Sequence, residues 1–89
     1  METFEDITKK MVALYNAKNK DYGNSFDQTL NEFGLVAGIV RLNDKLNRIK
    51  TLYKQEALVD ESIDDTLIDL ANYSIMCLLW RHKDDQTCY

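Results

Sequence analysis

Residues 61–73 read ESIDDTLIDLANY, and this stretch decides the fold because it sets a regular polar stripe into an otherwise apolar helix. At about 100° per residue, one side of that helix carries Asp65, Asp69, Asn72 and Met76. Apolar or small residues occupy most of the other positions, among them Ile63, Leu67, Ile68, Leu70, Ala71, Ser74, Ile75, Leu78 and Leu79. A helix that is apolar around so much of its circumference is expected at the centre of a protein, with its aspartates engaged rather than idle.

The composition predicts an all-α protein. The chain of 89 residues has no proline and three glycines, and no segment shows the sustained alternation of a strand. We expect a small antiparallel bundle with three main helices and one short helix. No linker, repeat or low-complexity segment interrupts the chain, so residues 1–89 are expected to form a single helical domain.

The first half of the chain contains two predicted helices separated by a break. The first helix is expected from about Glu5 to Lys18, with Thr3 as the N-cap. The break is centred on Gly23, which can take the left-handed conformation, and Asn24 or Ser25 can cap the next element. A short helix from Asp27 to Phe33, closed by Gly34, follows.

The second half contains two long helices. From Leu35 to Tyr53 the apolar positions recur at spacings of three and four, which predicts a seam for an antiparallel neighbour formed by Leu35, Ile39, Leu42, Leu46, Ile49 and Tyr53. After a short connection, the last helix is expected to start at a cap on Asp60 or Ser62 and to run to about His82. Residues 83–89 are polar and are expected to be frayed.

Charge and cysteine content exclude several classes of protein. A net charge of −4 argues against duplex nucleic acid as a partner, because binding through phosphate neutralisation needs a basic face. Cys77 and Cys88 have neither metal-ligand spacing nor a disulfide framework, which indicates a reduced compartment. There is no apolar run of about 18 residues and no signal-peptide pattern, so we expect a cytoplasmic protein without a membrane partner. Since a chain this small buries a modest core, we expect a homo-oligomer.

The helix predicted from Leu35 to Tyr53 has a basic flank. This flank lies opposite the acidic stripe of the last helix if the two helices pack antiparallel. Arg41, Lys45 and Arg48 share this flank, beside Asp44. One interpretation is an ion-pair network that fixes helix register, and spacing alone favours it. The other is a site in which the guanidinium groups receive phosphate while carboxylates hold a hard divalent cation. The metal ligands would then be Glu61, Asp64, Asp65 and Asp69.

The aromatic residues around Gly23 also allow two interpretations. Tyr22 and Phe26 can offer a stacking face for a base, with Lys20 near a phosphate. Alternatively, both rings pack on the bundle while Gly23 makes the turn, which local sequence favours. His82 and Cys77 are interpreted as structural, and the apolar end at residues 78–80 as core or a subunit contact.

Three separated segments together resemble a known family. They are KDYG at residues 20–23 with Ser25 and Phe26, the set Arg41, Asp44, Lys45 and Arg48, and DTLIDLANY at residues 65–73. In this order they resemble the small phage and bacterial family called nucleotide modification associated domain 1, from about Ile7 to Leu79. Members often occur in phage genomes near genes for altered nucleotides, so the resemblance implies a nucleotide or nucleotide-like ligand and, for a phage protein, the host cytoplasm.

The leading hypothesis is a helical protein that binds a nucleotide or nucleotide-derived phosphate. Its use would be nucleotide metabolism or modification, or sequestration of a signalling nucleotide used in host defence. The candidate ligand-binding residues are Lys20, Tyr22, Arg41, Asp44, Lys45, Arg48, Asp65, Asp69 and Asn72. Arg41, Lys45 and Arg48 would meet phosphate, Asp65, Asp69 and Asn72 would orient those cations or contact sugar or base, and Tyr22 would stack.

A more distant resemblance supplies the alternative of an enzyme. The paired acidic helices are similar to the all-α nucleoside triphosphate pyrophosphohydrolases of the MazG type, which hold magnesium with Glu-x-x-Glu on one helix and Glu-x-x-Asp on the next. Glu61 and Asp64 fit the second pattern, whereas the preceding helix lacks the first. A Mg²⁺- or Mn²⁺-dependent pyrophosphohydrolase would draw on these residues with Asp44, Asp65 and Asp69. A third alternative is a protein-binding module in which the charge network is purely structural.

Overall fold

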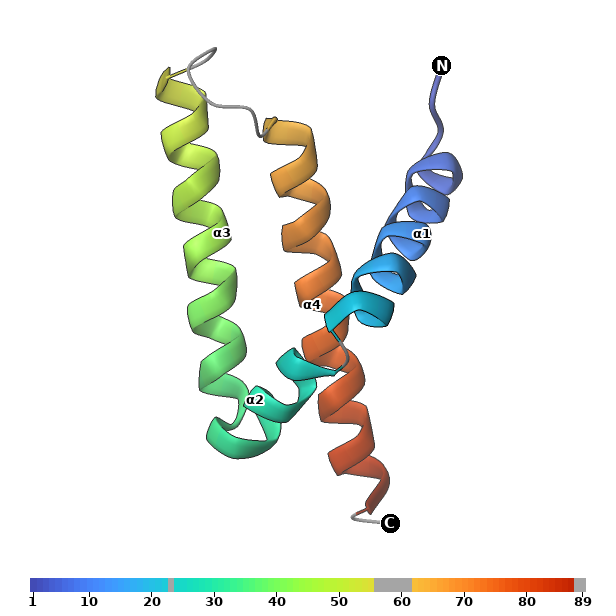
Figure 1. The fold of residues 1–89 in the computed structure, drawn as a ribbon, viewed down its shortest axis with the longest axis vertical. Helices are drawn as coiled ribbons and strands as arrows, with labels where there is room; N and C mark the ends of the chain where they lie inside the picture. Colours follow the sequence, from blue (N-terminus) through green and yellow to red (C-terminus); the bar gives the residue numbers. More distant parts are fainter. Residues whose placement is uncertain (23, 56–61, 88–89) are drawn as a thin grey trace.

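The described part of the chain is almost entirely helical. The computed structural model describes residues 1–22, 24–55 and 62–87, with side chains described for 1–19, 24–55 and 62–83. These ranges contain four helices and no strand: α1 (Phe4–Tyr22), α2 (Ser25–Phe33), α3 (Leu35–Gln55) and α4 (Ile63–Thr87) (Figure 1). The predicted all-α class, with three long helices and one short, is confirmed. No helix in the described part of the chain combines the length and apolarity needed to cross a membrane.

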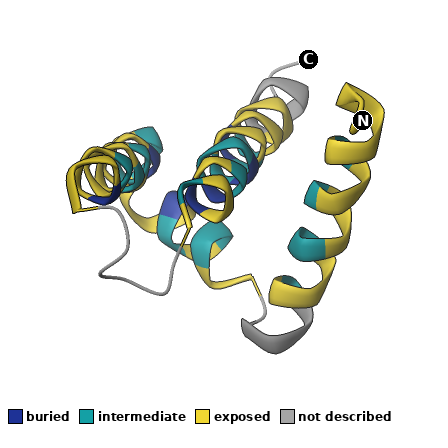
Figure 2. Ribbon diagram, turned by 90° about the horizontal axis from the view of Figure 1, so that it is seen from above, coloured by how far each residue is buried: buried dark blue, intermediate teal, exposed yellow. Residues whose placement is uncertain are grey.

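α3 and α4 form an antiparallel pair, and the other two helices pack against it. α2 crosses the pair at the end where α3 begins, and α1 leans against α4 and diverges from it toward the N-terminus (Figure 1). Seen from above, the buried residues of α3 and α4 lie on the sides that face each other and α2 (Figure 2). α4 therefore has the central place predicted for it, with α1, α2 and α3 all packed against it.

The predicted caps define three helix boundaries. The Thr3 hydroxyl accepts from the Asp6 N–H at 3.1 Å, and the Asp6 carboxylate accepts from the Thr3 N–H at 3.0 Å. The bond from the Thr3 N–H lowers the pKa of Asp6. Ser62 Oγ caps α4 by accepting from the Asp65 N–H at 3.0 Å, whereas Asp60 lies outside the described residues. Gly34 ends α2 with a φ of 82° and donates its N–H to the Leu30 carbonyl at 2.8 Å.

Three other helix boundaries differ from those predicted. α1 continues to Tyr22 instead of ending at Lys18, because residues 19–22 contain no helix breaker and Asn19 bonds back to Tyr15 one turn earlier at 3.2 Å. α2 begins at Ser25, two residues before the predicted start, and its N-cap Asn24 makes no side-chain capping bond. α4 continues through residues 83–87 to Thr87, beyond the predicted end at His82. Gly23, the predicted break, lies outside the described residues.

The predicted seam of α3 is wrong at three of its six positions. Ile39, Leu46 and Tyr53 are 56%, 44% and 76% exposed, while Gly38 and Leu52 are buried. Close approach at Gly38 explains the shift, because a Cβ atom built there would lie only 2.5 Å from Cys77 Sγ. α4 therefore meets α3 along the line through Gly38 rather than along the line of the large apolar residues.

The core is correspondingly small and partly polar. Among the described residues, the buried apolar side chains are Leu30, Leu52 and Cys77, and the buried polar ones are Thr66, Asp69 and Asn72. Asp69 and Asn72 of the polar stripe thus face inward, whereas Asp65 at its start is exposed. Leu67 and Leu78 from the apolar arc face solvent at 48% and 51% exposure. Burial also raises the pKa of the Cys77 thiol, consistent with a packing role.

A candidate anion-binding pocket

Asp69 joins three helices. The residue is 8% exposed. Its carboxylate accepts hydrogen bonds from Lys18 Nζ of α1 at 2.8 Å and from Lys45 Nζ of α3 at 3.3 Å. The Lys45 side chain is 20% exposed and that of Lys18 is 48% exposed, so Lys45 is the more strongly desolvated partner. The carboxylate therefore lies between two ammonium groups at the point where α1, α3 and α4 meet.

Arg41 adds a third cation, held by aromatic rings. Its guanidinium carbon lies 5.7 Å from the centre of the Phe26 ring and 5.2 Å from that of Tyr73. Its Nη1 donates to the Tyr73 hydroxyl at 3.2 Å. Phe26 and Tyr73 meet edge to face with centroids 4.9 Å apart, and Lys45 Nζ lies 5.6 Å from the Tyr73 ring. The rings therefore fix the direction of the guanidinium without neutralising it.

These groups border a cavity of about 330 Å³, which we call the cationic pocket. This volume is at the lower end of the range for small-molecule sites. All four helices contribute to the wall, and the lining residues are Tyr15, Lys18, Asn19, Ser25, Phe26, Arg41, Asp69, Asn72, Tyr73 and Met76. Lys45 reaches the same carboxylate from α3. An anion entering this cavity would meet Lys18 and Arg41 from two different helices.

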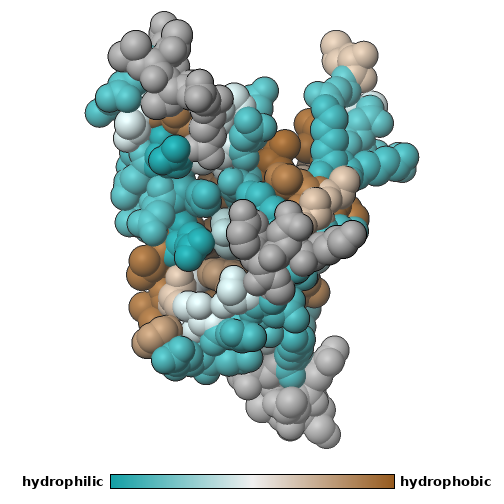
Figure 3. Space-filling view, in the orientation of Figure 1, coloured by the Kyte–Doolittle hydropathy of each residue, from teal (hydrophilic) through white to brown (hydrophobic). Residues whose placement is uncertain are grey.

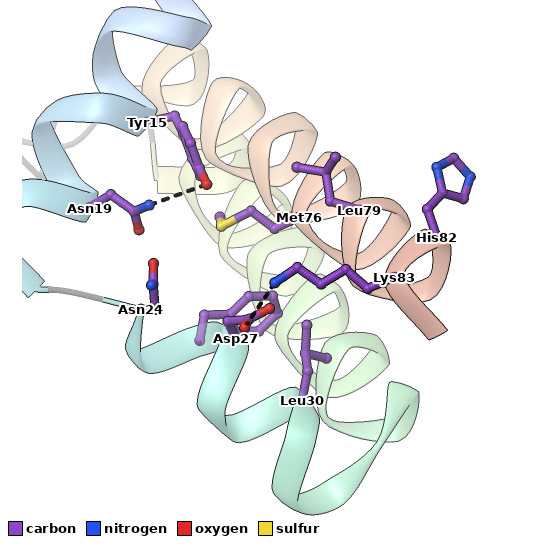
Figure 4. A pocket seen from close by; sticks show the side chains of 10 residues that line it. Tyr15, Asn19, Asn24, Asp27, Leu30, Met76, Leu79, His82 and Lys83 are labelled. Carbon is purple, nitrogen blue, oxygen red and sulfur yellow. Dashed lines mark hydrogen bonds and ion pairs between the residues drawn. The ribbon is translucent and has the colours of Figure 1, made fainter. Parts of the chain in front are cut away.

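A second cavity of about 380 Å³ shares a wall with the cationic pocket. The shared residues are Tyr15, Asn19, Phe26 and Met76. Its other side is formed by α2 and the end of α4, where Lys83 reaches toward Asp27 at 3.5 Å (Figure 4). The imidazole of His82 points away from the cavity (Figure 4). The second cavity, which adjoins the cationic pocket, is thus lined by the amides of Asn19 and Asn24 and the carboxylate of Asp27.

Asn72 fixes the position of α1. It is 8% exposed, and its side-chain N–H donates to the Met11 carbonyl of α1 at 3.2 Å. Together with the bond from Lys18 to Asp69, this contact ties α1 to α4 through polar groups at two levels. The amide therefore supports the pocket wall as well as lining it.

The structure brings together four of the predicted ligand-binding residues: Arg41, Lys45, Asp69 and Asn72. Three others, Asp44, Arg48 and Asp65, are exposed and do not line the cationic pocket. The side chains of Lys20 and Tyr22 lie outside the described residues.

The predicted metal ligands do not gather around Asp69 in the described part of the chain. Asp64 and Asp65 are exposed at the start of α4, and Glu61 lies outside the described residues. Within the described ranges, no three His, Cys, Asp or Glu side chains are placed to hold a metal ion.

Several lining residues were not predicted from the sequence. Lys18 lies at the predicted end of its helix and follows Met11 and Tyr15 at helical spacing on the inward side, and that spacing is a signal that could identify it. Tyr15 and Asn19 of the same helix line the cavity too, as does Tyr73 of the DTLIDLANY segment. Their convergence on one cavity depends on contacts between helices far apart in sequence.

The comparisons with known proteins concern the same region. A family model described as nucleotide modification associated domain 1 matches residues 18–80. The matched span begins at Lys18 and includes Arg41, Lys45 and Asp69. Neither the curated proteins nor the solved structures give a match.

Proposed function

The chain belongs to the nucleotide modification associated domain 1 family, and on this premise we propose that it binds a nucleotide or a nucleotide-derived phosphate in the cationic pocket. The observation that carries the proposal is the bridge from Asp69 to Lys18 and Lys45 beside the Arg41 guanidinium. Two lysines share the Asp69 carboxylate there and Arg41 lines the same cavity, so an incoming dianion would meet cations that are already held in position. Phosphate is the common biological anion that matches such a cluster.

The remaining groups of the wall suit the rest of a nucleotide. Phe26 and Tyr73 present ring edges and faces next to the cations, and Asn19 and Asn72 present side-chain amides. Rings of this kind stack on bases, and amides hydrogen-bond to base edges or sugar hydroxyls. With the phosphate at Arg41 and Lys18, the adjoining cavity would take the base or sugar. The protein would then act in nucleotide metabolism or modification, or sequester a signalling nucleotide.

Binding is tested with a matched pair of arginine variants on α3. We expect Arg41→Gln to weaken binding of a nucleoside phosphate at least about tenfold, because it removes an oriented charge-assisted donor from the cavity. Arg48→Gln makes the same change of charge seven residues along α3, outside the pocket lining, and is expected to change the affinity less than about twofold. Affinities are measured by titration calorimetry against nucleoside mono-, di- and triphosphates, with and without Mg²⁺.

Three outcomes would contradict the proposal. No heat and no shift in melting temperature with any nucleotide at millimolar concentration would remove it. Equal loss of affinity in both arginine variants would indicate diffuse electrostatic attraction instead of a site. Metal-dependent release of pyrophosphate would replace simple binding by the enzymatic alternative, with Asp65→Asn as the variant that should abolish it.

A further inference from the structure

The α3–α4 pair has an apolar side directed away from α2 and from the cationic pocket. We call this side the outer face, and its exposed members are Ile39, Leu46 and Tyr53 of α3 with Leu67 and Leu78 of α4. Gly38 of α3 and Cys77 of α4 mark the line along which the two helices touch. At about 100° per residue, the exposed residues of α3 point roughly a quarter turn away from Gly38 around the helix axis, and those of α4 point roughly a quarter turn away from Cys77. Because the helices are antiparallel, both rotations lead to the same side of the pair. Figure 2 shows exposed residues along the upper side of α3 and α4, opposite α2.

The α4 part of the outer face is symmetric in sequence. Reading along it from either end gives a charged residue, a leucine, a small residue, a small residue, a leucine and a charged residue, spaced three, four, three, four and three apart. These six residues are Asp64, Leu67, Ala71, Ser74, Leu78 and Arg81. The two charged residues at the ends have opposite signs.

This symmetry specifies one partner, a second copy of the same chain. When two α4 helices lie antiparallel about a two-fold axis midway between Ala71 and Ser74, each Leu67 meets a Leu78, and each Asp64 meets an Arg81. Ala71 and Ser74 then face each other at the centre, where small side chains let two helix backbones approach closely. The same two-fold axis places the two α3 helices on one side of the α4–α4 contact, with their exposed apolar residues facing each other. We infer that the protein forms a two-fold symmetric dimer through the outer face, with α4 packed against α4.

The size and chemistry of the outer face agree with this partner. Five large apolar side chains that are each half exposed or nearly so present on the order of 500 Å² of apolar area, in the upper part of the range for the largest apolar patch on a monomer. A standard interface buries roughly 800 Å² per partner, so this area would supply more than half of such a contact. No charged residue separates Leu67 from Leu78 among the six α4 positions of the face, and charge depletion is typical of interface centres.

The dimer leaves the cationic pocket open. Asp69 and the outer face lie on opposite sides of α4, since Asp69 is buried toward α1 and α3 while Leu67 and Leu78 face solvent. The inference does not rest on the proposed function, and loss of the dimer is not expected to remove the ligand site.

Sedimentation equilibrium of the full chain tests the dimer directly. We expect a mass of about twice the 10.4 kDa of the chain at micromolar concentration. Leu67→Glu is expected to raise the dissociation constant at least about a hundredfold, because it places two carboxylates in the apolar contact. Val12→Glu is the matched control, since Val12 on α1 is 58% exposed but lies off the outer face, and it should leave the dimer intact. Circular dichroism confirms that both variants remain helical.

A charge exchange tests the antiparallel register, and it does not depend on an apolar residue. Asp64→Arg alone, or Arg81→Asp alone, sets like charges against each other at both ends of the contact, and each is expected to weaken the dimer about tenfold. The double variant restores opposite pairs and should recover the original dissociation constant. The two residues stand about 25 Å apart along one helix, so recovery cannot come from a pair within one chain.

Other results would overturn the inference. A wild-type chain that stays monomeric at 100 µM would remove it. A dimer that persists in Leu67→Glu would show that another surface joins the copies. Single charge variants that the double variant fails to rescue would exclude the antiparallel α4 register.

Discussion

Replacing Asp69 with Asn is expected to lower the free energy of unfolding by about 2–3 kcal/mol. The substitution keeps the shape of the side chain and removes its charge, so Lys18 and Lys45 face each other without the carboxylate that separates them. Lys45 is largely withdrawn from water, and an unpaired ammonium there is costly. Lys18 is half exposed, and solvent screening of that partner keeps the loss below the range for a fully buried pair.

Asp65→Asn is the matched control for this experiment. Asp65 lies one turn before Asp69 on the same helix but is exposed, so the same chemical change should alter stability by less than about 0.5 kcal/mol. Urea denaturation followed by circular dichroism measures both variants at neutral pH. Equal small losses in the two would mean that the bridge to Lys18 and Lys45 contributes little, and the ion-pair account of this junction would fail.

Replacing Gly38 with Ala is expected to destabilise the protein by about 1–2 kcal/mol, although alanine favours a helix over glycine by up to about 1 kcal/mol. A Cβ atom at position 38 would lie 2.5 Å from Cys77 Sγ and 3.3 Å from Leu30 Cδ2. The contact with Cys77 is closer than real atoms tolerate, so either the buried Cys77 side chain must change rotamer or α3 and α4 must separate, and each costs packing energy. Overpacking in a small core outweighs the gain in helix propensity.

The double variant Gly38→Ala with Cys77→Ala separates these two effects. Without Sγ the new methyl group has room, so adding Gly38→Ala to the Cys77→Ala protein should cost little or increase stability. Chemical denaturation of the four proteins of the cycle gives the coupling energy. Independent, additive effects would show that close approach at Gly38 is not what sets the spacing of α3 and α4.

The sequence was sufficient to predict which segments are helical, and insufficient to predict which faces meet. Periodicity and the caps at Thr3, Ser62 and Gly34 are local features, and each of them is confirmed. The choice of face was not local, because Ile39 and Leu46 are as apolar as the residues that are buried. α3 and α4 touch along the side of α3 that contains Gly38. Glycine has no apolar side chain, so a search for apolar periodicity does not include it.

The candidate site was predictable where charges on neighbouring helices face each other. Antiparallel pairing of α3 and α4 brings Lys45 to Asp69, as the sequence suggested. Arg48 and Asp65 lie on nearly the same helix sides as these residues, yet each is exposed and outside the cationic pocket, because residues of α1 and α2 form much of its wall and the pattern of α3 and α4 does not indicate where those helices pack. Lys18 stands 51 residues before Asp69, and nothing in the local sequence of either indicates the other.

α1 is attached more weakly than the other three helices are to one another, so we expect it to open at a lower free energy than the rest of the molecule unfolds. α1 is held to α4 by the Lys18 and Asn72 bonds, its outer residues Phe4 and Val12 are exposed, and a cavity of about 320 Å³ remains between it and α4. The space-filling view shows hydrophobic residues in this gap (Figure 3). Detaching α1 would break these polar bonds and uncover Asp69 and Asn72, while leaving the buried apolar side chains of α2, α3 and α4 in place, so its opening requires less free energy than global unfolding. An anion bound between Lys18 and Arg41 would bridge the two parts, and occupancy of the pocket would thereby be coupled to the closing of α1.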